Sequence, residues 1–207
     1  MNYFYMQKRG FLSINRALQI IAVGAGLLAW LPATAQTMIE ASMSGQTQKY
    51  TKHGIVDACS FRIAGRAEPG GGNARRLFDV ILTLNKVGAI VKLAGFELPR
   101  GKIGLENLAP LPNYGGWLKA QGKKAAAPIS PLKDGKEPPN AKLFLADTDG
   151  AVEVFNAVAN NAVVEVAIRW QPDIESIYFG RVSIKDTQVD QFYKCLDDLK
   201  MTLRARQ

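Results

Sequence analysis

Histidine and cysteine are scarce in this sequence, which has one histidine and two cysteines among 207 residues. A single histidine excludes a metal site built from several histidines, and it leaves a Ser–His–Asp triad only one candidate base. That residue, His53, lies in a polar stretch beside Lys52 and Gly54, which indicates a surface position. The sequence therefore predicts no metal site, no cofactor and no histidine-dependent catalysis.

Other motifs that carry catalysis are incomplete here. Gly70–Gly72 lies between predicted strands and lacks the helix N-terminus and the Lys-Ser/Thr pair of a phosphate-binding loop. Asp197 and Asp198 are adjacent on a predicted helix and diverge by about 100°. Asp147 and Asp149 begin like a calcium loop, but valines and no closing glutamate follow, so a turn is expected. We expect a protein that is not an enzyme, and an envelope enzyme using only carboxylates is the least favoured hypothesis.

Long hydrophobic runs are also absent, except for Ala17–Leu31 near the N-terminus. Three basic residues precede this run, and Ala33 and Ala35 fit the small-residue pattern that signal peptidase reads, with Gln36 following. We therefore expect residues 1–35 to be a signal peptide and residues 36–207 to be one exported, periplasmic domain without a membrane span. The alternative is an uncleaved anchor, although the run is shorter than the ~20 residues that span a bilayer.

Both cysteines, Cys59 and Cys195, lie after the signal, and an even number of cysteines in an oxidising compartment favours a disulfide. Cys195 falls within Asp186–Leu199, where apolar residues share one face of a predicted helix (Val189, Phe192, Leu196 and Leu199). Cys59 lies at an inward position of a predicted strand. A bond between them would tie the last helix to an early strand.

Alternating apolar residues predict strands over 54–67, 77–85, 89–98, 142–146, 163–170 and 177–184. Residues 152–161 form a second predicted helix, whereas residues 36–52 are either a leader or a weak edge strand. The fold class is therefore mainly β or α+β, an antiparallel barrel- or sandwich-like domain with two short helices closed by one disulfide. The proline-rich middle is expected to be irregular, with a flexible basic loop at 119–139.

The middle of the chain also supplies the candidate binding residues. Lysines Lys119, Lys123 and Lys124 follow two aromatic residues, Tyr114 and Trp117. Their charge suits an anionic polymer or an acidic partner face. The alternative is that solvated lysines keep the loop soluble. Because three of the 26 basic and none of the 18 acidic residues lie in the signal, the remaining chain has a net charge of only about +5, which is unlike a nucleic-acid-binding protein.

The order of these features resembles the N-terminal domain of MotY, the periplasmic component of the T ring around sodium-driven flagellar motors. The similarity covers residues 57–199 and consists of the early Cys59, the segments LFDVILTLNK, NAKLFLADTDGAV and VVEVAIRWQ, and a closing F-x-x-C-L-x-x-L. It implies a strand-rich, barrel-like body closed by Cys59 and Cys195 that attaches to partner subunits. In this family a peptidoglycan-binding domain follows, whereas eight residues follow Leu199 in this sequence, and the lysine-rich middle differs from the family.

These observations lead to one favoured hypothesis and one main alternative. We expect a non-enzymatic structural or adaptor protein of an envelope-spanning machine, with a flagellar motor ring as the leading example, and its partners to be protein subunits, in a ring or homo-oligomer. The alternative is a free periplasmic binding module or inhibitor that recognises an anionic polymer or a protein through the lysine-rich loop.

Overall fold

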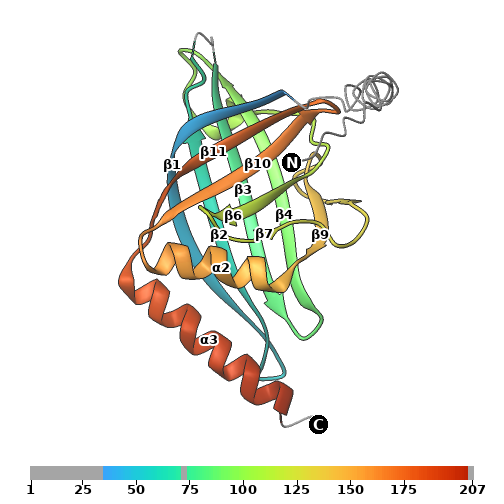
Figure 1. Cartoon of the computed structure of the whole chain (residues 1–207), viewed down its shortest axis with the longest axis vertical. Coiled ribbons are helices and arrows are strands. Elements are labelled where there is room, and N and C mark those ends of the chain that lie inside the picture. The colour runs from blue at the N-terminus through green and yellow to red at the C-terminus, as the bar shows by residue number, and fades with distance from the viewer. Residues whose placement is uncertain (1–34, 71–73, 205–207) are drawn as a thin grey trace, which may run out of the picture. The chain divides into compact units, whose positions relative to one another are not determined.

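Strands dominate the computed structural model, which describes residues 35–70 and 74–204 (Figure 1). The expected signal peptide, apart from Ala35, lies outside the described residues. The strands are β1 (Ala35–Lys52), β2 (Ile55–Ala67), β3 (Ala74–Asn85), β4 (Gly88–Pro99), β5 (Ala109–Pro110), β6 (Gly116–Ala120), β7 (Ala125–Ala126), β8 (Lys133–Asp134), β9 (Lys142–Ala146), β10 (Val163–Gln171) and β11 (Ile174–Ser183). The helices are η1 (Leu105–Asn107), α2 (Thr148–Ala159) and α3 (Asp186–Arg204). The predicted strand-rich fold with two α-helices is confirmed.

The strands form one sheet in the order β7-β6-β10-β11-β1-β2-β3-β4-β9-β8, with β5 beside β4. Most neighbours are antiparallel, as expected, but β1 and β11 run parallel, with Met38 opposite Ile177. The sheet is therefore mixed rather than purely antiparallel. Its inward residues bury a single core, and both α-helices pack across one end of the curled sheet (Figure 1).

The segment expected to be a leader or a weak edge strand is instead a central strand. β1 lies between β2 and β11: its first half pairs with β11, its second half pairs with β2, and the two ladders overlap at Met43 and Ser44. Its inward positions hold the small or unbranched residues Ala41, Met43 and Gly45, all buried. Gly45 lies beneath the Phe61 ring, since a Cβ there would be 3.0 Å from that ring. The bulk that completes this part of the core comes from β2, and the hydrophobic pattern of β1 is correspondingly weak.

The two ends of the sheet approach each other, but no continuous ladder closes them into a barrel. Two chain segments cross between them instead. In the first, Leu111 N donates to Gly95 O of β4, and Tyr114 N then donates to Arg169 O of β10. In the second, which follows β7, the amide of Ile129 donates to Leu145 O of β9. A sandwich-like description therefore fits the sheet better than a barrel-like one.

The first crossing segment depends on a buried asparagine. Asn113 is 6% exposed, and its Nδ2 donates to Leu93 O at 3.0 Å while its Oδ1 accepts from Gly115 N at 2.9 Å. One side chain thus pairs with a carbonyl of β4 and with the amide of Gly115 just before β6. An apolar residue at position 113 would leave both of these contacts unmade. Part of the expected irregular middle is regular, as β6 and the short strands β7 and β8, which pair with β6 and β9.

An aromatic cluster joins the helices to the sheet. Phe155 of α2 and Phe192 of α3 have ring centroids 4.1 Å apart, and both contact Phe61 of β2 in edge-on geometry. All three side chains are at most 1% exposed. Burial of each of these side chains stabilises the fold by roughly 2–3 kcal/mol. The cluster is therefore a main reason why the helices stay packed on the sheet.

Candidate functional site

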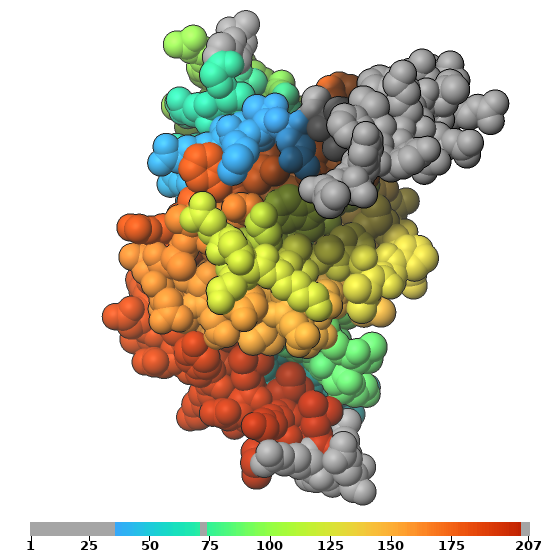
Figure 2. Space-filling model, in the orientation of Figure 1, coloured from blue at the N-terminus to red at the C-terminus, as the bar shows by residue number. Residues whose placement is uncertain are grey.

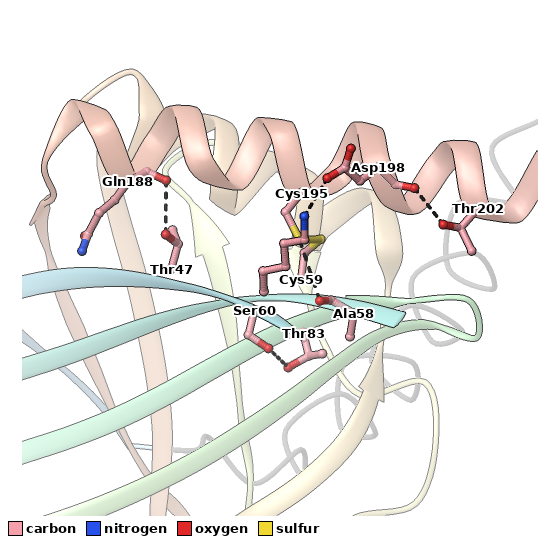
Figure 3. Close-up of a disulfide and its surroundings, with 10 residues drawn as sticks. Thr47, Ala58, Cys59, Ser60, Thr83, Gln188, Cys195, Asp198 and Thr202 are labelled. Atoms are coloured by element: carbon pink, nitrogen blue, oxygen red, sulfur yellow. Dashed lines mark hydrogen bonds and ion pairs between the residues drawn. A yellow bond between two sulfur atoms is a disulfide. The ribbon is translucent and has the colours of Figure 1, made fainter. Parts of the chain in front are cut away.

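The predicted disulfide between Cys59 of β2 and Cys195 of α3 is confirmed (Figure 3). The S–S distance is 2.05 Å, the Cα atoms are 5.9 Å apart, and the bond spans 136 sequence positions. The two residues are 0% and 2% exposed, so the bond is sealed in the core. A disulfide between residues this deeply buried has a structural role rather than a role in thiol exchange.

Polar contacts hold α3 to the sheet on both sides of the disulfide (Figure 3). Thr47 Oγ1 donates to Gln188 O at 3.2 Å, and Lys49 Nζ donates to Asp198 Oδ2 at 2.8 Å. The hydrogen bond from Lys49 holds the pKa of the Asp198 carboxyl below its usual value. Asp198 therefore helps to hold α3 on the sheet. Asp197 is exposed on the adjacent position, in keeping with the expectation that the two carboxylates diverge.

The structure brings together only some of the predicted binding residues. Trp117 and Lys119 share the outer face of β6, with Lys119 Nζ 5.1 Å from the centre of the indole ring. Lys119 Nζ is also 2.9 Å from a carboxylate oxygen of Glu165, whose side chain is 8% exposed. The positive charge of Lys119 is thus used within the protein, because a nearly buried carboxylate requires a cationic partner.

Lys124 is likewise paired, at the start of α2. Its Nζ is 2.7 Å from Asp147 Oδ2 and 3.8 Å from Asp149 Oδ2. Asp147 caps the helix, since its other oxygen accepts from Gly150 N at 2.9 Å. The Lys124 ammonium first, and the Gly150 amide second, hold the pKa of the Asp147 carboxyl below its usual value. The segment expected to be a turn is therefore a helix cap, and Lys123 alone of the three lysines has no ion pair among the described residues.

Large apolar side chains are exposed in the same part of the chain. Tyr114, Ile129 and Leu132 are 47%, 67% and 40% exposed, and we call these three residues the seam patch. Tyr114 comes just before β6, whereas Ile129 and Leu132 lie between β7 and β8. This part of the chain appears in yellow-green and yellow on the face shown in Figure 2. Leu132 reaches the backbone beside Tyr114, since a Cβ on Gly115 would be 2.7 Å from Leu132 Cδ1. The binding role of Tyr114, Trp117, Lys119, Lys123 and Lys124 stays a prediction.

The remaining polar candidates have structural positions. His53 and Gly54 both have positive φ, 53° and 77°, and form the turn between β1 and β2. His53 is exposed, as expected. Gly70 is exposed in a turn, and Gly71–Gly72 lies outside the described residues. Within the described part of the chain, no group of three or more His, Cys, Asp or Glu residues is arranged to hold a metal ion.

A buried tyrosine was not anticipated from the sequence. Tyr178 of β11 is fully buried, packs on Phe78 at 4.8 Å, and has Trp170 at its edge. Its hydroxyl makes no well-formed hydrogen bond with the described residues, although Trp170 and Ser176 approach it, and burial raises its pKa. A raised pKa and the lack of exposed surface make this hydroxyl unsuitable as a base or nucleophile. The cluster is part of the core.

None of the helices in the described ranges combines the length and apolar character needed to cross a membrane. Comparison of the chain with protein-family models, with curated proteins and with solved structures finds no match.

Proposed function

We propose that the protein is a non-enzymatic adaptor of the cell envelope, exported to the periplasm and bound there to protein subunits of a larger assembly. The proposal joins the export pattern of the sequence to the buried disulfide, which suits an oxidising compartment. A ring around a flagellar motor, as implied by the resemblance to the MotY domain, is the leading example of such an assembly.

The observation that carries this proposal is the contrast between the lysines and the seam patch. Two of the three candidate lysines are neutralised by carboxylates of the same chain. Tyr114, Ile129 and Leu132 are each at least 40% exposed and belong to the same region. Aromatic and aliphatic side chains form the centre of protein interfaces, whereas an anionic polymer requires free cations. The seam patch therefore favours a protein partner.

A second candidate function is the binding of an anionic polymer. Lys123, Lys133 and Lys136 are exposed and form no ion pair with the described residues. These three ammonium groups would be available to phosphates or carboxylates of the envelope. Such binding would weaken steeply with salt, because exposed charges are screened within about 8 Å at physiological ionic strength.

Crosslinking in intact cells tests the two candidates. A photoreactive residue is placed at Ile129 in the tagged protein, and the control carries it at Ala64, an exposed position on the outer face of β2. We expect a crosslink to an envelope protein at position 129 but not at position 64. The same adduct at both positions would contradict the proposal.

Substitutions at the two surfaces complete the test. Changing Tyr114, Ile129 and Leu132 to serine should abolish co-purification of the partner, while changing Lys123, Lys133 and Lys136 to glutamine should not. Sedimentation with cell-wall material that only the lysine substitutions abolish would favour the polymer-binding function instead.

A further inference from the structure

Two hairpins turn at the same end of the sheet, the end that α3 also reaches (Figure 1). The β1–β2 turn is His53-Gly54, between the paired residues Lys52 and Ile55. The β3–β4 turn is Lys86-Val87, between Asn85 and Gly88. Because pairing of β2 with β3 ends at Ala58 and Asn85, residues 55–57 of β2 project beyond the second turn. The two turns thus form a step.

A cavity of about 350 Å³ lies in this step. Its lining residues are Lys52, His53, Ile55, Asp57 and Lys86. Neither lysine forms an ion pair with any described residue, in contrast to Lys119 and Lys124. Two lysines and one aspartate are among the lining residues, so the cavity carries a net positive charge and suits a phosphate-sized anion.

Apolar side chains are exposed beside the cavity. Val87 is 68% exposed and Ile55 is 45% exposed. A valine in a two-residue turn is unusual, since Asn, Gly, Asp, Ser and Pro are the residues that favour turns. Here Asn85 supplies the turn chemistry, because its Oδ1 accepts from Val87 N at 2.8 Å and from Gly88 N at 3.2 Å. The valine is therefore not needed to form the turn, and most of its side chain stays exposed to solvent.

The end of α3 adds to the same surface. The ion pair between Lys49 and Asp198 fixes the C-terminal half of α3 beside the β1–β2 hairpin. Beyond it, Met201 is 63% exposed and Leu203 is 36% exposed, with Lys200 also exposed. Both cationic and apolar side chains are thus exposed at the end of the molecule formed by the two turns and α3, which we call the hairpin end.

We propose that the hairpin end binds the surface of a membrane that contains anionic phospholipids. Lys52 and Lys86 contact lipid phosphates, and Val87 and Ile55 enter the interface between the headgroups and the acyl chains. A free phosphate would use the lysines alone and would leave the apolar tips in water. A lipid surface uses both, because surface binding combines buried apolar area with attraction to anionic headgroups.

This binding is independent of the seam patch. Tyr114, Ile129 and Leu132 lie on other elements, so a membrane-bound protein would retain a separate surface for a protein subunit. The inference therefore goes beyond the proposed function, and each can fail without the other. It assigns the hairpin end to the bilayer and the seam patch to the assembly.

Vesicle flotation tests the proposal with the exported, purified protein. Wild-type protein should float with vesicles of phosphatidylcholine mixed with phosphatidylglycerol, and much less with phosphatidylcholine alone. Each lysine near an anionic surface contributes roughly a fivefold gain in affinity, so the Lys52→Gln/Lys86→Gln variant should bind about thirtyfold more weakly. Val87→Ser should lose roughly tenfold through the missing apolar contact.

Matched controls separate specific docking from general attraction. The Lys133→Gln/Lys136→Gln variant removes the same charge elsewhere and should bind vesicles nearly as well as wild type, as should the serine variant of the seam patch. Circular dichroism melting checks that each variant is folded. Three results would overturn the proposal: no flotation of wild type, an equal loss in the Lys133/Lys136 control, or saturable binding of inorganic phosphate at Lys52 and Lys86 without vesicle binding.

Discussion

Removal of the disulfide should lower the stability of the protein more than most single packing changes. The bond closes a loop of 136 positions, and in the chain-entropy model a loop of that length is worth about 5 kcal/mol. For a domain of this size that loss corresponds to a fall in melting temperature of roughly 10–20 °C. The Cys59→Ala/Cys195→Ala variant is the suitable test, because alanine introduces no polar atom at positions that are 0% and 2% exposed. Thermal unfolding followed by circular dichroism measures the change.

The wild-type protein in its reduced state provides the control. Reduction in denaturant, followed by refolding with the reductant retained, keeps both sulfur atoms in the core but removes the covalent bond. If the reduced protein melts near the double variant, the bond itself is responsible; if it melts near the oxidised protein, packing of the sulfurs is responsible. A fall of less than about 3 °C in both, equivalent to about 1 kcal/mol, would refute the loop-closure argument.

Two smaller perturbations test other contacts. Gly95→Ala should destabilise the protein by about 1–3 kcal/mol in urea unfolding, because a Cβ there would be 2.0 Å from Trp170 Cη2. The control is Gly70→Ala, which should not destabilise the protein because a Cβ at that position has no atom within 4 Å. Equal losses of stability in the two variants would show that the contact with Trp170 is not the cause. Lys124→Met should lower stability at neutral pH but not in strong acid. The reason is that the folded pKa of Asp147 is lowered chiefly by Lys124, so the stabilisation is complete above the unfolded pKa of ~3.9 and is lost as pH falls through the lower folded value. A difference between Lys124→Met and wild type that is unchanged in acid would show that the ion pair is not its cause.

The sequence was sufficient for those features that depend on local periodicity. Alternation of Phe61 and Ile63 with Arg62 places the strand β2 and its inward face correctly. Spacing of Phe192, Cys195 and Leu199 places α3 and its buried side, and the scarcity of cysteine leaves one possible disulfide. These patterns arise because burial on one side of an element fixes the period of its apolar residues.

Features that depend on contacts between distant segments could not be predicted from local periodicity. β1 has small inward residues because Phe61 fills the space above Gly45, so its own sequence reads as polar and weak. The sequence alone presents Lys119 as a free cation, but pairing of β6 with β10 places it opposite Glu165. One signal of this ion pair was present in the sequence: Glu165 is the single acidic residue of the otherwise apolar segment VVEVAI. A carboxylate in a buried strand requires a cation as its partner.

The parallel pairing of β1 with β11 links the beginning of the described chain to its last strand. Until the last strand has been made, β1 has only β2 available, so the edge of residues 35–44 that β11 covers in the complete fold stays open. A chain that is cut or stalled before Ser183 would present this open edge to other chains and to proteases. The fold can therefore be completed only when almost all of the described chain is present, and a truncated fragment would be prone to aggregation and cleavage.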